Sequence, residues 1–131
     1  MKLTGGCHCG AIRFRAEGDP AGVGICHCRD CQTFSGAPWR ASIPVAAADL
    51  VIEQGAPQVY IKTAESGRRR AQGFCGSCGS SIYATEADDP QVYNLRLGAV
   101  DQRAELPPQR QSWCGSALAW AQDIREIPPT D

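Results

Sequence analysis

The sequence predicts a mainly β fold with only short helical turns. Glycine and proline recur about every ten residues and separate short segments, as is typical of β proteins with tight turns. Several of these segments alternate apolar and polar side chains, which is the pattern of a strand with one buried face. The chain has 131 residues and contains no repeat or linker, so we expect a single domain over residues 1–131.

The expected strands are short, and helical segments are few. The first strand, residues 11–16, alternates apolar and charged side chains. One-turn helices are expected at 30–34, 46–49 and 116–121, with Trp120 packed on the body of the domain and residues 127–131 loose. The remaining strands are expected at 39–45, 50–54, 59–63, 70–74, 81–84 and 92–97, where the alternation continues towards residue 100.

Composition and charge exclude several classes of partner. The net charge is −1 and the pI is about 6.1, so neither a nucleic acid nor an acidic membrane surface is expected as a partner. No segment approaches the roughly 18 apolar residues that a membrane span requires. The N-terminal residues lack the apolar core of a signal peptide, so we expect a cytoplasmic location. No heptad pattern or long apolar edge indicates an oligomeric state.

Cysteine spacing is the strongest functional signal. Eight cysteines in a sequence without a secretion signal favour metal binding over disulfides. Seven of them have a neighbouring cysteine with only one or two residues between, and such neighbours rarely meet disulfide geometry but readily bind one ion together. We therefore predict two zinc ions per chain. The groups are Cys7-x-Cys9, Cys26-x-Cys28-x-x-Cys31 and Cys75-x-x-Cys78, with Cys114 alone.

Cys75 and Cys78 form the most specific local motif, Cys-Gly-Ser-Cys-Gly. Two thiolates at this spacing bind one Zn²⁺ from a tight turn, and the glycine after them permits a positive φ. Cys7 and Cys9 are expected to complete the site, because residues i and i+2 of an extended chain point to one side while His8 points away. The four cysteines predict a closed structural site on which folding depends.

Cys26, Cys28 and Cys31 are left without a further cysteine pair. Three protein ligands and one open position are typical of a catalytic zinc site. We expect the fourth position to hold water or a substrate thiol, with His27 or Cys114 as alternatives. His27 lies between two ligands and would normally face away, while Cys114 is more readily interpreted as a small buried residue.

The three motifs occur in a characteristic order. Cys-His-Cys-Gly stands at 7–10, Cys-His-Cys-Arg-Asp-Cys-Gln at 26–32 and Phe-Cys-Gly-Ser-Cys-Gly at 74–79. Together with segments 5–14, 34–39 and 59–67, this order resembles the glutathione-dependent formaldehyde-activating enzyme (GFA) family, which includes the centromere protein V domain. The resemblance covers about residues 3–125, where we place the core of the zinc-binding domain.

The resemblance implies a small zinc-stapled sheet domain of the β-tent or Mss4-like fold. It implies a carbon–sulfur lyase activity, the formation of S-(hydroxymethyl)glutathione from formaldehyde and a small-molecule thiol, glutathione. It also implies a structural zinc site at Cys7, Cys9, Cys75 and Cys78, and a catalytic zinc site at Cys26, Cys28 and Cys31.

A zinc ion with three thiolates carries a net charge of −1, so it is suited to hold a substrate thiol as thiolate. The sulfur of that thiolate would add to the carbonyl carbon of formaldehyde. A closed fourth position would instead indicate a zinc-stapled interaction module without catalysis. The candidates for proton transfer are His8, His27, Asp30 and Glu65.

Other polar and aromatic residues have structural interpretations. Arg29 and Arg40 are expected to offset the negative thiolate sites. Residues 68–70, three consecutive arginines, are expected in a solvated loop, with a clamp for the carboxylates of a peptide-like thiol as the alternative. The tryptophans are expected in the core or at its rim: Trp39, Trp113 and Trp120.

Overall fold

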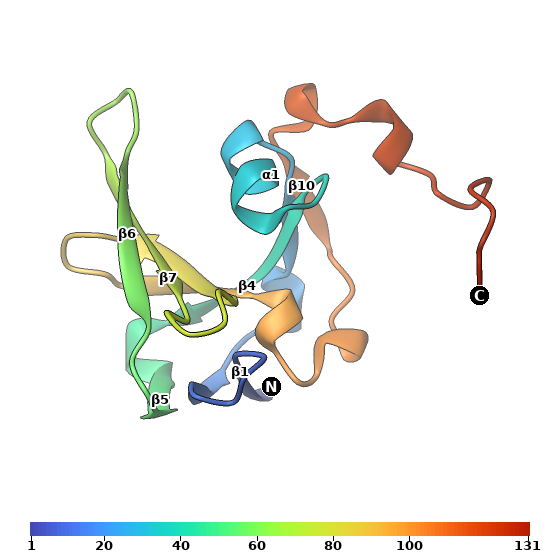
Figure 1. Cartoon of the computed structure of the whole chain (residues 1–131). Coiled ribbons are helices and arrows are strands. Elements are labelled where there is room, and N and C mark those ends of the chain that lie inside the picture. Colours follow the sequence, from blue (N-terminus) through green and yellow to red (C-terminus); the bar gives the residue numbers. More distant parts are fainter.

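The computed structural model describes residues 1–131 and contains ten strands and one short α-helix (Figure 1). The predicted mainly β fold is therefore confirmed. The single helix has seven residues, and no helix has the length and apolar character needed to cross a membrane. The elements are β1 Lys2–Gly6, β2 Arg13–Glu17, β3 Gly24–Cys26, α1 Arg29–Ser35, β4 Arg40–Ala46, β5 Leu50–Gln54, β6 Gln58–Thr63, β7 Arg69–Phe74, β8 Ser81–Glu86, β9 Val92–Arg96 and β10 Arg110–Ser112.

The strands form two sheets. A small sheet has the order β1–β2–β5, and a seven-stranded sheet has the order β10–β3–β4–β9–β8–β7–β6. All neighbouring strands are antiparallel except β10 and β3, which run parallel. The chain passes from the large sheet to the small one through the short turn between β4 and β5 (Figure 1).

The core is shared by both sheets because each presents one apolar face to the other. Phe14 and Ala16 of β2 are buried, while the side chains between and beside them are exposed or half-buried. Ile43 and Val45 of β4 alternate in the same way, and all four belong to one cluster of 13 buried residues. Burying a large apolar side chain stabilises the fold by about 1.5–3 kcal/mol, so this shared cluster holds the sheets together.

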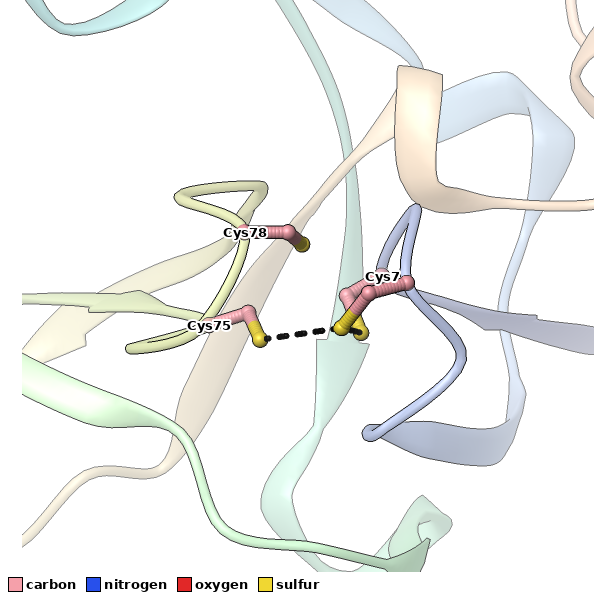
Figure 2. A group of neighbouring side chains, drawn as sticks. Cys7, Cys75 and Cys78 are labelled. Atoms are coloured by element: carbon pink, nitrogen blue, oxygen red, sulfur yellow. Dashed lines mark hydrogen bonds between the residues drawn. The ribbon is translucent and has the colours of Figure 1, made fainter.

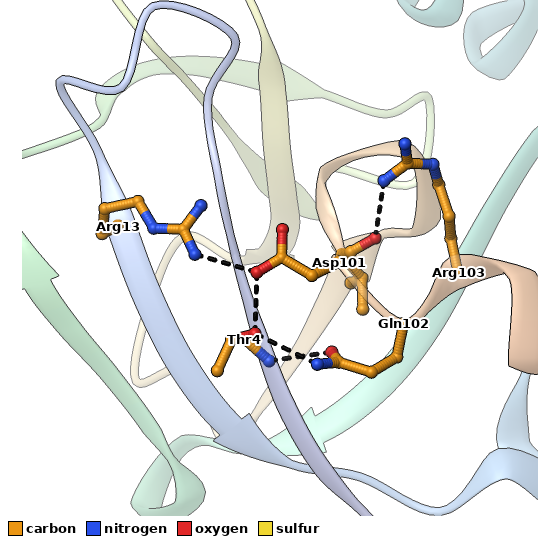
Figure 3. A network of polar contacts seen from close by, with 6 residues as sticks. Thr4, Arg13, Asp101, Gln102 and Arg103 are labelled. Carbon is orange, nitrogen blue, oxygen red and sulfur yellow. Dashed lines mark hydrogen bonds and ion pairs between the residues drawn. The ribbon is translucent and has the colours of Figure 1, made fainter.

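A polar network fixes β1 against the segment after β9 (Figure 3). The carboxylate of Asp101 accepts hydrogen bonds from the hydroxyl of Thr4 at 2.7 Å and from the Arg13 guanidinium at 2.8 Å. The side chain of Gln102 accepts from the Thr4 amide at 3.0 Å. Gly5 and Val100 also form an isolated bridge, so the strand that leads to Cys7 is tied to a distant part of the chain.

The predicted strand at 50–54 coincides with β5, and six others overlap their observed strands closely. The sequence did not indicate β1, β3 or β10, of which two have three residues and β1 contains two glycines. The expected continuation of the strand beyond residue 97 is wrong, because Leu97–Ala99 form a 3₁₀ turn.

The C-terminal segment leads away from the sheets (Figure 1). The expected helical turns there are two 3₁₀ turns, Cys114–Ser116 and Ala119–Ala121. The expected packing of Trp120 is wrong, since its side chain is 62% exposed, and Trp113 is likewise exposed.

Candidate metal centres

Cys7, Cys9, Cys75 and Cys78 converge into one cluster between the two sheets (Figure 2). Their sulfur atoms all lie within 4.8 Å of one another, with Sγ–Sγ distances of 3.6 Å from Cys7 to Cys9 and 3.8 Å from Cys9 to Cys75. A tetrahedral zinc ion with Zn–S bonds of about 2.3 Å would have edges of about 3.8 Å. The sulfur positions therefore fit one tetrahedral metal ion, and all eight cysteines are free of disulfides.

Two similar turns bring these sulfurs together. The Gly10 amide donates to the Cys7 carbonyl at 3.2 Å, and the Gly79 amide donates to the Cys75 carbonyl at 2.8 Å. Both glycines have a positive φ, +83° and +78°, which a residue with a side chain adopts only with strain. The expectation that an extended chain would align Cys7 and Cys9 is wrong, since β1 ends at Gly6 and a turn follows.

The four thiols differ in how readily each loses its proton. Hydrogen bonds from the Ser80 hydroxyl and amide lower the pKa of Cys78 to about 5. The Ala11 amide lowers the pKa of Cys9, but the Cys7 thiol and burial outweigh it and raise the pKa to about 11. A metal ion binds thiolates only, so binding at this cluster releases protons.

Cys26, Cys28 and Cys31 form the second cluster, at the junction of β3 and α1. Their sulfur atoms lie within 4.8 Å of one another, and no fourth His, Cys, Asp or Glu atom joins them. Cys28 occupies the N-cap position of α1, and its sulfur accepts a hydrogen bond from the Cys31 amide at 3.3 Å. The start of the helix therefore sets the spacing of the three thiols.

Burial and charge act differently on these three thiols. Burial raises the pKa of Cys31 to about 12, against the lowering effect of the Arg40 cation. The pKa of Cys26 is lowered although burial opposes it, because the Cys28 amide and the neighbouring thiols hydrogen-bond to its sulfur. The cluster thus has three potential thiolate ligands and positive charge beside it.

Two buried arginines lie next to this second cluster. Arg40 and Arg96 are 8% and 7% exposed, and the side-chain oxygen of Gln72 accepts a hydrogen bond from each, at 3.3 and 3.2 Å. Burial and the Arg40 cation lower the pKa of Arg96 to about 9, while Cys31 and Cys26 act to raise it. Arg40 also lies over the ring of Phe34, 5.4 Å from its centroid.

Comparison with known proteins places the chain in a family. A family model described as glutathione-dependent formaldehyde-activating enzyme matches residues 2–116. The chain belongs to the GFA family. A Halomonas elongata protein provisionally named a glutathione-dependent formaldehyde-activating enzyme is 31% identical over 114 residues, which cover 84% of this chain and 73% of the relative.

A crystal structure of a Rhodobacter sphaeroides protein matches with a TM-score of 0.64, over 86% of this chain and all of that one. The two sequences are 21% identical, so this likeness shows the fold alone. The mainly β architecture of this GFA-family chain therefore recurs in a solved structure.

The alternative fourth ligands of this GFA-family chain lie apart from the second cluster. His27 points to the other side of β3, where its Nε2 atom lies 2.7 Å from the Gln111 side-chain oxygen. Cys114 is exposed, which contradicts the interpretation of it as a buried residue. Both residues line a cleft of about 740 Å³ that contains none of the clustered thiols.

The candidates for proton transfer are also engaged elsewhere or exposed. His8 is exposed and its amide donates to the Ser80 hydroxyl at 3.0 Å. Asp30 forms an ion pair with Lys62, and Glu65 lies exposed in the β6–β7 turn. The structure brings none of these side chains into the second cluster.

The three consecutive arginines do not form the expected solvated loop. Arg69 and Arg70 begin β7, and all three arginines pair with carboxylates at the end of β8 or just after it. Arg68 and Arg70 pair with Glu86, the last residue of β8, and Arg69 pairs with Asp88. A clamp for a substrate carboxylate would have to break these ion pairs. Gln72 and Arg96 were not predicted as site residues, because each is only a polar residue within an otherwise β-like segment of the sequence.

Proposed function

We propose that this protein is a zinc-dependent enzyme that joins glutathione to formaldehyde as S-(hydroxymethyl)glutathione, a carbon–sulfur lyase reaction. Membership of the GFA family and the name of the Halomonas relative support the substrate pair. The observation that carries the proposal is the incomplete second cluster, with three thiols and no fourth protein ligand. A metal ion there has a coordination position left for a substrate.

The proposal assigns different roles to the two clusters. Zinc held by the four-thiol cluster would join the turn after β1 to the turn between β7 and β8 and stabilise the domain over 1–131. Zinc held by the three-thiol cluster would lower the pKa of a substrate thiol beside it. The proposed ligands are Cys7, Cys9, Cys75 and Cys78 for the structural ion, and Cys26, Cys28 and Cys31 for the catalytic ion.

The reaction balances without a further reagent. The glutathione thiol loses its proton to solvent, and its sulfur lone pair forms a bond to the carbonyl carbon of formaldehyde. The carbon–oxygen π pair moves to oxygen, which takes a proton and becomes the hydroxyl group. Cys26 and Cys31 lie where β3 meets α1, so a substrate sulfur bound beside them would have a fixed position.

Calorimetric titration of glutathione into zinc-replete protein tests the thiol site. We expect saturable binding with one site per chain, and a proton release that appears as a dependence of the heat on the buffer. S-methylglutathione is the matched control ligand, because it keeps every group except the free thiol. It should bind at least tenfold more weakly. Equal binding of the two ligands would contradict thiol coordination.

The rate of adduct formation tests the chemistry. Formaldehyde and glutathione combine spontaneously, so the rate is compared with an enzyme-free control by following the adduct in NMR exchange spectra. Cys28→Ser should lose the acceleration and Cys114→Ser should keep it. Two bound zinc ions without any thiol binding would instead favour the interaction module, whose second metal takes no substrate.

A further inference from the structure

Arg40 and Arg96 are two buried cations without a carboxylate partner. The ion pairs on this side of the large sheet involve Lys62, Arg68 and Arg70, and none involves either of the two buried arginines. The Nε and Nη1 atoms of Arg40 and the Nε atom of Arg96 are buried and have no hydrogen-bond acceptor in the protein. Their shared contact is a neutral amide oxygen, that of Gln72.

Burying two arginines without a carboxylate partner destabilises the fold unless negative charge lies nearby. Arginine keeps its proton in proteins, so the pair cannot escape the cost by becoming neutral. A buried charge without a counter-charge is strongly unfavourable, and two like charges that share one acceptor also repel each other. The position of these residues therefore requires an anionic group that the carboxylates of the chain do not supply.

The register of the sheet places the arginines beside the second cluster. Cys26 of β3 is directly opposite Arg40 of β4, and Ser42, two residues further along β4, is opposite Arg96 of β9. Opposite residues in antiparallel strands share a face, as do residues two apart on one strand. The Ser42 hydroxyl also lies 2.6 Å from the Arg96 guanidinium, which confirms the shared face.

The helix covers the same face. Phe34 of α1 packs under the Arg40 guanidinium and against the ring of Tyr60 of β6, with ring centroids 6.1 Å apart. Cys31 lies one helical turn before Phe34 on the same helix and is 8% exposed. The arginines and the three thiols therefore occupy the same poorly hydrated space between α1 and the large sheet, where charges act on one another strongly.

Lys62 and Arg70 nearby are paired with carboxylates, and the charges of the remaining groups balance only with an anionic fourth ligand. A zinc ion with three thiolates has a charge of −1, and the two arginines contribute +2. A neutral ligand at the fourth position leaves an excess of +1, whereas a thiolate brings the sum to zero. The deficit is one negative charge, which is the charge of one thiolate.

We infer that Arg40 and Arg96 are positioning residues that select an anionic fourth ligand, a thiolate, at the Cys26, Cys28 and Cys31 centre. The inference rests on the metal assigned to that centre under the proposed function. Gln72 holds the two guanidinium groups together, and its neutral amide leaves their positive charge available to the ligand. The pair thus explains why a thiol would bind in its ionised form at neutral pH.

The test measures ligand binding to the cobalt-substituted protein, whose visible absorption reports the ligands of a tetrahedral site. The probes are 2-mercaptoethanol and azide, which bind as anions, and imidazole, which binds as a neutral donor. These small probes lack the peptide groups of glutathione, so they report charge preference alone. Cobalt per chain and the circular dichroism spectrum are measured for every variant.

Gln72→Glu is the most informative variant because it keeps both arginines and places a carboxylate between them. We expect about tenfold weaker binding of both anions and unchanged binding of imidazole, with a fold at least as stable as the wild type. Arg96→Gln should also weaken the binding of both anions, and Arg96→Lys should bind them within about threefold of the wild type. Arg68→Gln, at an exposed ion pair, is the matched control and should change nothing.

The outcomes separate this inference from the proposed function. Equal binding of 2-mercaptoethanol to the wild type and to Gln72→Glu would overturn the role of the arginines while leaving the thiol site intact. Azide binding that depends on Arg96, without any binding of 2-mercaptoethanol, would support an anion-selecting pair and contradict a thiol substrate. Absence of binding by either anion to the wild type would overturn both.

Discussion

The two cysteine clusters use the same ligand but differ in how their members are spaced along the chain. In the four-thiol cluster of Cys7, Cys9, Cys75 and Cys78, called the closed cluster below, Cys9 and Cys75 are 66 residues apart. Their sulfurs lie 3.8 Å apart between two turns. In the three-thiol cluster of Cys26, Cys28 and Cys31, called the open cluster below, all three residues lie within one short segment at the start of α1. Metal in the first would close a long loop, whereas metal in the second would close almost none.

Their surroundings differ as well. Cys7 and Cys75 of the closed cluster are part of the apolar core, and Cys75 is only 2% exposed. The open cluster lies beside Arg40 and Arg96, which form no ion pair with a carboxylate of the chain. Under the proposed function, this difference would make the first cluster a structural metal site and leave the second, with a missing ligand and unpaired charge beside it, available for chemistry.

The largest effect on the stability of the fold is expected for Cys75→Ser. Structural zinc sites contribute about 10–16 kcal/mol of binding free energy, which is comparable to the whole stability of a small domain. We expect the variant to bind at most one zinc ion and to lose its cooperative thermal unfolding transition, measured by circular dichroism. Cys114→Ser, at an exposed cysteine outside both clusters, is the control and should keep both ions. A folded Cys75→Ser variant would contradict the structural role.

Cys28→Ser tests whether the open cluster can lose its metal without loss of the fold. Because the open cluster closes no long loop, loss of its metal should leave the domain folded, with a Tm within about 5 °C of the wild type. Zinc content should fall from two ions to one, and glutathione binding should disappear. If this variant unfolded as Cys75→Ser is expected to, the division of roles between the clusters would be wrong.

The cysteine pairs and the triplet were predictable from sequence because the spacing within each group is local information. Cysteines with one or two residues between them are well placed to bind one ion together, and the residues of each group do lie together in the structure. The way in which Cys7 and Cys9 approach each other was not predictable from strand periodicity, because a turn with a glycine at positive φ replaces the strand there. In that turn the Cys7 amide donates to the Ile12 carbonyl five residues further along the chain, a hydrogen bond that alternation does not encode.

The surroundings of the open cluster were less predictable because they depend on strand order. Gln72 meets Arg96 and Arg40 only because β7, β8, β9 and β4 are neighbours in the large sheet. The short strands β3 and β10 lack alternation and are stabilised by their neighbours rather than by their own pattern. The cleft lined by His27 and Cys114 likewise requires β10 beside β3, which no local signal indicated.

A smaller effect on stability is expected at Gly79, in the turn that carries Cys75 and Cys78. Gly79→Ala adds a Cβ atom that meets nothing within 4 Å, so its cost comes from the positive φ alone. We expect a loss of about 1–2 kcal/mol in the free energy of unfolding, measured by urea denaturation of the zinc-loaded protein. Gly98→Ala is the matched control, because its Cβ atom also meets nothing and its φ is not in the left-handed region. Equal losses in both variants would show that the turn conformation is not the cause.

The smallest effect concerns Asp101, which ties β1 and β2 to the segment after β9 (Figure 3). Hydrogen bonds from Thr4 and Arg13 lower the pKa of this carboxyl in the folded protein. A lowered folded pKa stabilises the fold at pH values above the unfolded pKa of about 4, and the benefit is lost as the pH falls through the folded value. Because the side chain is 45% exposed, solvent screens the pair and limits the gain to about 1 kcal/mol or less.

Asp101→Asn should therefore lower the free energy of unfolding by about that amount at pH 7. The difference from the wild type should stay constant from pH 8 to pH 5 and shrink as the pH approaches 4, with zinc content checked at each point. Asp123→Asn is the matched control, because Arg125 also lowers the pKa of Asp123 but lies only two residues away. Such a local pair persists in the unfolded chain and adds little to the difference between the two states. A loss at Asp123 equal to that at Asp101 would show that connecting distant segments is not what makes the Asp101 network stabilising.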